Sequence, residues 1–187
     1  MPNHVYSIIT VEEEYNDKLK EIAKVGLCKY YKPMPEELNN VKAPNRDLAS
    51  AKELTKKYGH GDWYSWSNAN WGTKWGCYDG EYDDGLYRFT TAWGAVKDDI
   101  IQMLLKDIPT LTYQWEEEQG YGMESEYFNG EQSNYFEWDL PDFDLTDNDE
   151  IQFLTEDYQN GEGCFKKGYY SWSLDEYLGD TYEEALK

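Results

Sequence analysis

The stretch VYSIITVEEEYNDKLKEIAKVG, residues 5–26, holds the pattern that decides the fold. Residues 5–11 are mostly β-branched or aromatic, which predicts a β-strand. Leu19 and Ile22 then lie at helical spacing, and Gly26 follows them, so we expect a helix that ends at this glycine. A strand followed directly by an amphipathic helix is the opening of a mixed α and β fold.

Further elements of the same kind follow along the chain. Their apolar patterns predict strands at 73–79, 86–93 and 111–118 and a helix at 98–107. With the first strand and helix, the order becomes strand, helix, strand, strand, helix, strand. This is the order of the ferredoxin-like split βαβ fold, whose antiparallel sheet buries one face on two helices. We therefore predict an α+β protein with a ferredoxin-like domain at residues 1–120.

Residues 28–72 interrupt this order and are predicted to form a helical insertion. A short strand is expected at 27–31, where the first helix has ended. A helix is expected at 47–58, followed by a short aromatic helix that the side chain of Asp62 can cap.

The remaining residues, 121–187, are predicted to form an acidic, β-rich C-terminal extension of a β-hairpin and helices that packs on the first domain. The pair Asn129-Gly130 is typical of a type I′ hairpin turn, and a helix is expected at 148–159. Capping boxes are predicted for Thr10 with Glu13, Ser173 with Glu176, and Thr181 with Glu184.

Charge is distributed unevenly along the chain. The 187 residues include 17 Lys/Arg and 38 Asp/Glu, a formal net charge of −21. Residues 113–187 hold 3 of these basic and 21 of these acidic residues, a net charge of −18. A region of that charge repels nucleic acid, so we expect no direct nucleic-acid contact through it.

The cysteines and the apolar runs indicate the cellular compartment in which the protein is expected. Cys28, Cys77 and Cys164 form no CxxC pair and no Cys/His cluster, which predicts three reduced thiols and neither a disulfide framework nor a zinc site. We expect no signal peptide and no membrane span, because no basic start precedes an apolar run and no such run approaches about 18 residues. These features predict a cytoplasmic protein.

Three short motifs resemble those of a known family. PMPEEL (33–38), NWGTKW (70–75) and FTTAW (89–93) are similar to motifs of the Api-like or YubB-like proteins of bacteriophages and plasmids. The resemblance covers roughly residues 1–130 and departs at 94–96, where Gly-Ala-Val replaces the Ser-Pro-Pro common in the family. It implies a ferredoxin-like domain and the cytoplasm of an infected or plasmid-bearing bacterium, but no reaction.

Tryptophans gather around the stretch NANWGTKWG, residues 68–76. The preferred interpretation is an aromatic mini-core that clamps the insertion onto the sheet, with each ring burying about 150–250 Å². The alternative is a cleft in which Lys74 holds an anion while a flat ring stacks on tryptophan, as in single-stranded nucleic-acid binding. The residues of this possible ligand cleft are Trp63, Trp66, Asn70, Trp71, Lys74, Trp75 and Trp93.

Carboxylates form two dense groups, and these residues are Glu116, Glu117, Glu118, Asp142, Asp144, Asp147, Asp149 and Glu150. A calcium loop begun at Asp142 or Asp144 would have aspartate in place of the required glycine at its sixth position, so no metal site is predicted. The groups are interpreted either as a solvated face that keeps the protein soluble or as a surface that binds a basic partner.

The sequence contains no recognisable arrangement of catalytic residues. GxSxG, HExxH and P-loop motifs are missing, and His4 and His60 belong to no nucleophile arrangement. We therefore expect neither enzyme activity nor a cofactor. The leading hypothesis is a phage or mobile-element accessory protein that binds a host protein, as an acidic nucleic-acid mimic or a counter-defence inhibitor. The alternatives are a small-ligand or nucleotide-binding module that uses the tryptophans, and a structural component of the phage particle.

Overall fold

The computed structural model describes residues 3–139, 143–148, 150–155, 158–160, 163–171 and 176–187. The chain divides into two compact units, Met1–Glu137 and Trp138–Lys187. Within the described residues, helices and strands are mixed, as the sequence predicts for an α+β protein.

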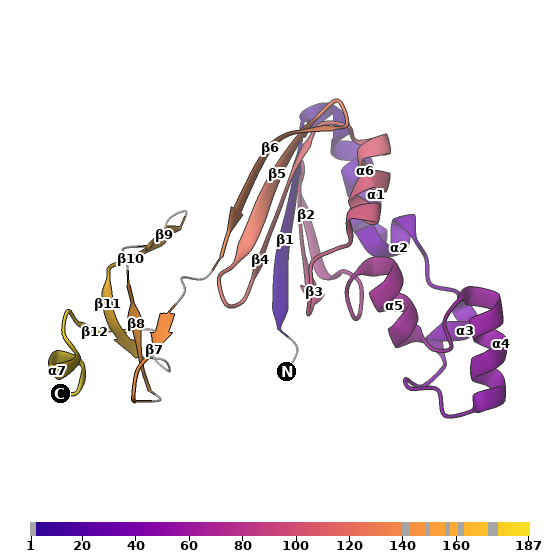
Figure 1. Cartoon of the computed structure of the whole chain (residues 1–187). Coiled ribbons are helices and arrows are strands. Elements are labelled where there is room, and N and C mark those ends of the chain that lie inside the picture. Colours follow the sequence, from indigo (N-terminus) through magenta and orange to yellow (C-terminus); the bar gives the residue numbers. More distant parts are fainter. Residues whose placement is uncertain (1–2, 140–142, 149, 156–157, 161–162, 172–175) are drawn as a thin grey trace. The chain divides into compact units, whose positions relative to one another are not determined.

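The first unit is built on a six-stranded antiparallel sheet with the strand order β2-β3-β1-β4-β5-β6 (Figure 1). Its strands are β1 (His4–Val11), β2 (Tyr78–Asp83), β3 (Leu86–Ala92), β4 (Leu111–Glu117), β5 (Gly122–Phe128) and β6 (Glu131–Trp138). β1 lies in the middle, with Val5 opposite Thr91 of β3 on one side and opposite Glu117 of β4 on the other.

Two helices cover one face of this sheet, α1 (Asn16–Val25) and α6 (Asp98–Asp107) (Figure 1). In β1, the side chains of Val5 and Ile9 are buried toward the helices, whereas Tyr6 on the opposite face is 54% exposed. Full burial of one such aliphatic side chain contributes roughly 1.5–3 kcal/mol to folding. The predicted helices at both positions are confirmed, and the glycine stop of α1 is confirmed by Gly26, which has φ 89°.

Four helices lie between α1 and β2. They are α2 (Leu27–Tyr31), α3 (Glu36–Asn39), α4 (Leu48–Tyr58) and α5 (Trp63–Trp71). The Asp47 side chain caps α4 by accepting hydrogen bonds from the Ala49 and Ser50 amides. The Asp62 side chain caps α5 by accepting one from the Ser65 amide at 2.8 Å. The predicted helical character of this insertion is therefore confirmed.

Three local predictions in the first unit are wrong. Residues 27–31 form helix α2 and not a strand, because the adjacent side chains of Leu27 and Cys28 are both buried, which an alternating strand does not allow. Strand β2 begins at Tyr78 and not at residue 73, because glycines with positive φ bend the chain before it. The predicted capping box at Thr10 does not form, since β1 continues to Val11.

The Asn129-Gly130 turn joins β5 to β6, and both residues have positive φ, 53° and 82°. The predicted hairpin is therefore confirmed. Its two strands extend the sheet of the first unit, so the division of the chain lies after residue 137, whereas the sequence placed it after residue 120.

The second unit contains a four-stranded sheet with the order β12-β11-β8-β7 and a two-stranded sheet of β9 and β10. The elements are β7 (Phe143–Leu145), β8 (Ile151–Leu154), β9 (Tyr158–Asn160), β10 (Gly163–Phe165), β11 (Gly168–Ser171), β12 (Tyr177–Gly179) and α7 (Tyr182–Ala185). Ile151, Leu154 and Tyr170 are its buried apolar residues among those described. The predicted capping box of Thr181 and Glu184 is confirmed at the start of α7.

The helix predicted at 148–159 is wrong, because strand β8 and the start of β9 occupy this segment. β8 is paired on both sides, with β7 and with β11, so its backbone hydrogen bonds are satisfied by neighbouring strands. The other predicted cap, Ser173, lies outside the described residues. In the part of the chain that the structure describes, no helix has the length and apolar character to cross a membrane.

Candidate functional site

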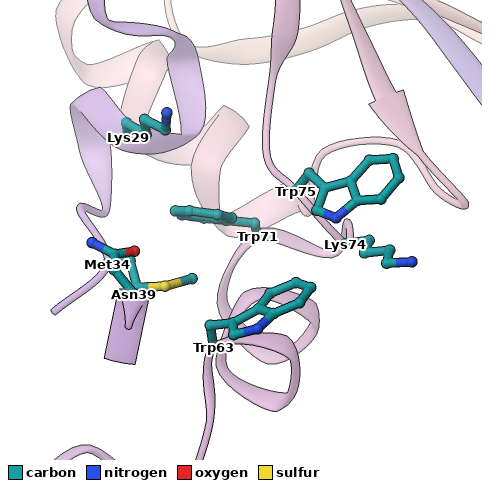
Figure 2. A pocket seen from close by; sticks show the side chains of 7 residues that line it. All are labelled: Lys29, Met34, Asn39, Trp63, Trp71, Lys74 and Trp75. Carbon is teal, nitrogen blue, oxygen red and sulfur yellow. The ribbon is translucent and has the colours of Figure 1, made fainter. Parts of the chain in front are cut away.

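A cavity of about 290 Å³ opens in the first unit, in the helical insertion and the loop that follows it. Figure 2 shows Trp71 in the middle, with Trp63, Trp75 and Lys74 to one side of it. The other lining residues are Lys29, Met34 and Asn39. Three indoles and two ammonium groups therefore come from segments that are up to 46 residues apart in sequence, from 29 to 75.

The rings of Trp66 and Trp71 form the structural base of this site. Their centroids lie 5.3 Å apart at 89°, an edge-to-face contact, and both side chains are buried. Trp71 Nε1 donates a hydrogen bond to the Lys32 carbonyl at 2.8 Å, which connects α5 to the end of α2. This contact fixes the two walls of the cavity to each other.

The loop of residues 72–76 turns Lys74 and Trp75 outward. Gly72 and Gly76 have φ 79° and 72°, a region that favours glycine. A Cβ atom on Gly76 would lie 3.2 Å from the Trp71 ring, so the loop passes close over that ring. The Lys74 carbonyl accepts a hydrogen bond from the Ser67 hydroxyl at 2.8 Å, which ties the loop back to α5.

The Lys74 ammonium lies between two tryptophan rings. Its Nζ atom is 4.5 Å from the centroid of Trp75 and 4.2 Å from that of Trp93, both cation–π distances. Trp75 is 43% exposed and Trp93 49% exposed, so these rings form a surface rather than a core. In Figure 2 the Lys74 side chain extends away from Trp71, which places its charge at the rim of the cavity.

The segment that forms the cavity has the opposite charge to the rest of the protein. Residues 27–76 contain 8 Lys/Arg and 5 Asp/Glu, a net charge of +3. The other residues contain 9 Lys/Arg and 33 Asp/Glu, a net charge of −24. An anion approaching the chain is therefore attracted to the insertion and repelled elsewhere.

The structure brings together part of the predicted tryptophan site. Trp63, Trp71, Lys74 and Trp75 line the cavity. Trp93 is not among the lining residues, and its ring lies 4.2 Å from Lys74 Nζ. The predicted ligand role of Trp66 and Asn70 is not supported, since Trp66 is buried and Asn70 Nδ2 donates to the Trp66 carbonyl within α5.

Three lining residues were missed by sequence reasoning, namely Lys29, Met34 and Asn39. They come from α2, the turn after it and α3, and no spacing or motif relates them to the tryptophans. Only the folding of these short helices against Trp71 brings them to the site. The PMPEEL motif contains Met34, but it was interpreted only as a family resemblance and not as part of a site.

Of the three predicted acidic residues at the end of β4, Glu116 and Glu118 are exposed and Glu117 is buried. Glu116 is exposed, but Glu117 is only 2% exposed and its Oε2 accepts a hydrogen bond from the Gln119 amide at 2.7 Å. Glu117 is therefore a buried side chain that holds the β4–β5 turn, a position that does not favour its predicted role as a partner contact. The carboxylate of Glu118 accepts a hydrogen bond from the His4 amide at 3.1 Å.

Two of the predicted acidic residues line a second cavity, in the second unit. This cavity has a volume of about 390 Å³ and is lined by Asp144, Thr146, Asp147, Phe153, Tyr169 and Tyr182. Its aromatic wall is continuous, with Tyr169 centred 4.6 Å from Phe153 and 5.5 Å from Tyr182. Glu150 is exposed, whereas Asp142 and Asp149 lie outside the described residues.

Among the residues that the structure describes, no three His, Cys, Asp or Glu side chains are grouped so that they could hold a metal ion. Comparisons of the chain with protein-family models, with curated proteins and with solved structures find no match.

Proposed function

We propose that the first unit binds a planar, negatively charged small molecule, and that a nucleotide is the class that fits best. The observation behind this proposal is the cavity in which partly exposed indoles lie beside Lys29 and Lys74. A base stacks on an indole whatever its identity, typically for about 1–3 kcal/mol. An ammonium group beside the stacked ring then holds the phosphate.

The size and charge of the cavity support this class of ligand. A volume of about 290 Å³ lies at the lower end of small-molecule sites, roughly 300–1,000 Å³, and suits one mononucleotide. Asn39 adds a side-chain amide that can donate to and accept from a base edge. The net positive segment around the cavity selects an anion.

We infer that the core of this unit is ferredoxin-like. The strand order β2-β3-β1-β4, with neighbouring strands antiparallel and α1 and α6 on one face, supports this inference. The proposed role is binding and not catalysis, because the lining side chains supply stacking surface and positive charge. The resemblance to Api-like or YubB-like proteins makes a phage or plasmid accessory role the proposed context.

The proposal is tested by titrating the full-length protein with mononucleotides and nucleoside triphosphates while tryptophan fluorescence is recorded. We expect saturable quenching, and at least about tenfold weaker binding in Trp75→Ala and Lys29→Ala, because each loses one of the two contacts. Lys52→Ala is the matched control, since Lys52 is an exposed lysine of α4 that does not line the cavity.

Two results would contradict the proposal. One is that no nucleotide changes the fluorescence or raises the melting temperature of the folded protein. The other is that Lys52→Ala weakens binding as much as Lys29→Ala does, which would reduce the site to general electrostatic attraction.

A second candidate function is supported by the acidic cavity of the second unit. Asp144 and Asp147 lie with three aromatic rings around it, a combination that suits a lysine or arginine side chain. We propose that this cavity is the contact for a basic host protein. Asp144→Asn with Asp147→Asn should release that partner, whereas Glu183→Gln, an exposed carboxylate of α7, should not. Equal retention of the partner by all three forms in a pull-down would exclude this role.

A further inference from the structure

Two cysteines that are 49 residues apart in sequence meet in the first unit. The Sγ atoms of Cys77 and Cys28 lie 3.4 Å apart, and the Cys77 thiol donates to the Cys28 sulfur. Cys28 is in the first turn of α2, and Cys77 precedes β2 directly. A disulfide bond measures about 2.05 Å, so the two sulfurs need to approach by about 1.4 Å.

The two thiols differ in their access to solvent. Cys28 is fully buried, whereas Cys77 is partly exposed. The close contact with the Cys77 thiol, followed by burial, raises the pKa of the Cys28 thiol well above its usual range. A soluble oxidant therefore meets Cys77 first, and Cys28 is held beside it as the second sulfur.

We propose that Cys28 and Cys77 are a redox-active pair that closes to an intramolecular disulfide in the presence of a disulfide oxidant such as oxidised glutathione. This proposal does not depend on the proposed ligand binding. It also changes the expectation from sequence, in which the three cysteines were unrelated reduced thiols.

The reaction is a pair of thiol–disulfide exchanges. The Cys77 thiolate attacks one sulfur of oxidised glutathione, so a mixed disulfide forms and one glutathione leaves as a thiol after taking up a proton. Cys28 then attacks the Cys77 sulfur, its proton passes to the departing glutathione sulfur, and the second glutathione leaves as a thiol. Two protein thiols are oxidised and one glutathione disulfide is reduced to two thiols.

The bond would join the two sides of the tryptophan cavity. Lys29 follows Cys28 on α2, and Cys77 ends the loop that holds Lys74 and Trp75. At Gly76, a Cβ atom would lie 3.4 Å from Cys28 Cβ, which shows how closely the loop already packs on α2. Closing the pair therefore fixes the loop to the helix without a large rearrangement of the backbone.

The test uses the full-length Cys164→Ser protein, which removes the third thiol. The folded protein is equilibrated with defined ratios of oxidised to reduced glutathione, and the remaining thiols are alkylated after acid quenching and counted by mass spectrometry. We expect the loss of two thiols together, a mass decrease of two hydrogen atoms, and a cross-linked peptide that contains Cys28 and Cys77. We also expect the oxidised form to melt about 5 °C or more above the reduced form.

A second variant keeps the result interpretable. Adding Cys28→Ser should leave a stable glutathione adduct on Cys77, because no second sulfur is present to release it. The proposal is overturned if the Cys164→Ser protein retains both thiols in oxidised glutathione. It is also overturned if that protein keeps the same persistent adduct on Cys77 as the Cys28→Ser variant, or forms only intermolecular dimers.

Discussion

The helical insertion, residues 27–76, and the second unit, residues 138–187, each contain a cavity but have opposite net charges. Each has a cavity walled by aromatic rings, with tryptophans in the insertion and with Phe153, Tyr169 and Tyr182 in the second unit. The insertion has a net charge of +3, whereas the second unit has 3 Lys/Arg and 14 Asp/Glu, a net charge of −11. The polar groups beside the rings follow these charges, with lysines in one cavity and aspartates in the other.

This difference shows that the net charge of a chain does not describe the charge around each of its cavities. The total of −21 suggests only repulsion of anions, yet one segment of about 50 residues attracts them. Surface charges act over roughly 8–10 Å at ordinary ionic strength, so each cavity responds mainly to its own surroundings. The two cavities should therefore be separable by mutation.

The largest expected effect is a loss of folding stability when the buried ring of Trp71 is removed. Trp71 is buried against Trp66, so Trp71→Ala should lower the free energy of unfolding by about 3–5 kcal/mol, as truncations of large core rings do. Urea unfolding followed by circular dichroism measures this loss. Trp75→Ala removes a ring that is 43% exposed and should cost much less. Equal losses in the two variants would show that the insertion has no single organising ring.

An effect of intermediate size is expected from removing the charged side chains beside the rings. Lys29→Ala should weaken nucleotide binding about tenfold or more, because a charge-assisted contact is lost, and should leave the binding of a lysine-rich peptide unchanged. Asp144→Asn should do the reverse. Fluorescence titration for the nucleotide and calorimetry for the peptide measure the two affinities. If either substitution weakened both ligands alike, the two cavities would not be independent sites.

The smallest effect concerns the cap that starts the aromatic helix. Asp62→Ala removes the acceptor for the Ser65 amide and should destabilise the first unit by about 1 kcal/mol. Asp62→Ser keeps a side-chain acceptor at this position and should therefore retain most of the wild-type stability. Thermal and urea unfolding of the three proteins measure the difference. No change in Asp62→Ala at neutral pH would show that tertiary contacts alone hold α5.

The same cap has an expected pH dependence. Burial alone would raise the pKa of Asp62, but hydrogen bonds from the Ser65 hydroxyl and amide outweigh it and lower the pKa. A carboxylate whose pKa is lowered by folding stabilises the protein above its unfolded pKa, about 3.9, and loses this contribution as the pH falls through the folded pKa. The gap in stability between the wild type and Asp62→Ala should therefore narrow below about pH 4.

Most of the secondary structure that was predicted correctly has a local signal. α4 and α5 follow an aspartate cap and end at a glycine, and the β5–β6 hairpin follows from the Asn-Gly pair. The errors at 27–31 and 148–159 lie where short apolar runs fit a helix and a strand equally well. In these segments tertiary contacts decide between helix and strand, because they bury the side chains and supply partners for the backbone hydrogen bonds.

The sequence by itself determined the α and β elements with local caps and turns, the tryptophan cluster and the uneven charge, since these depend on neighbours within a few residues. Only the tertiary structure decided that Lys29 and Asn39 join the tryptophans, that Glu117 is buried, and that Cys28 meets Cys77. The physical reason is that these contacts join segments far apart in the chain. Their free energy comes from packing and burial, and spacing along the sequence does not encode where such segments meet.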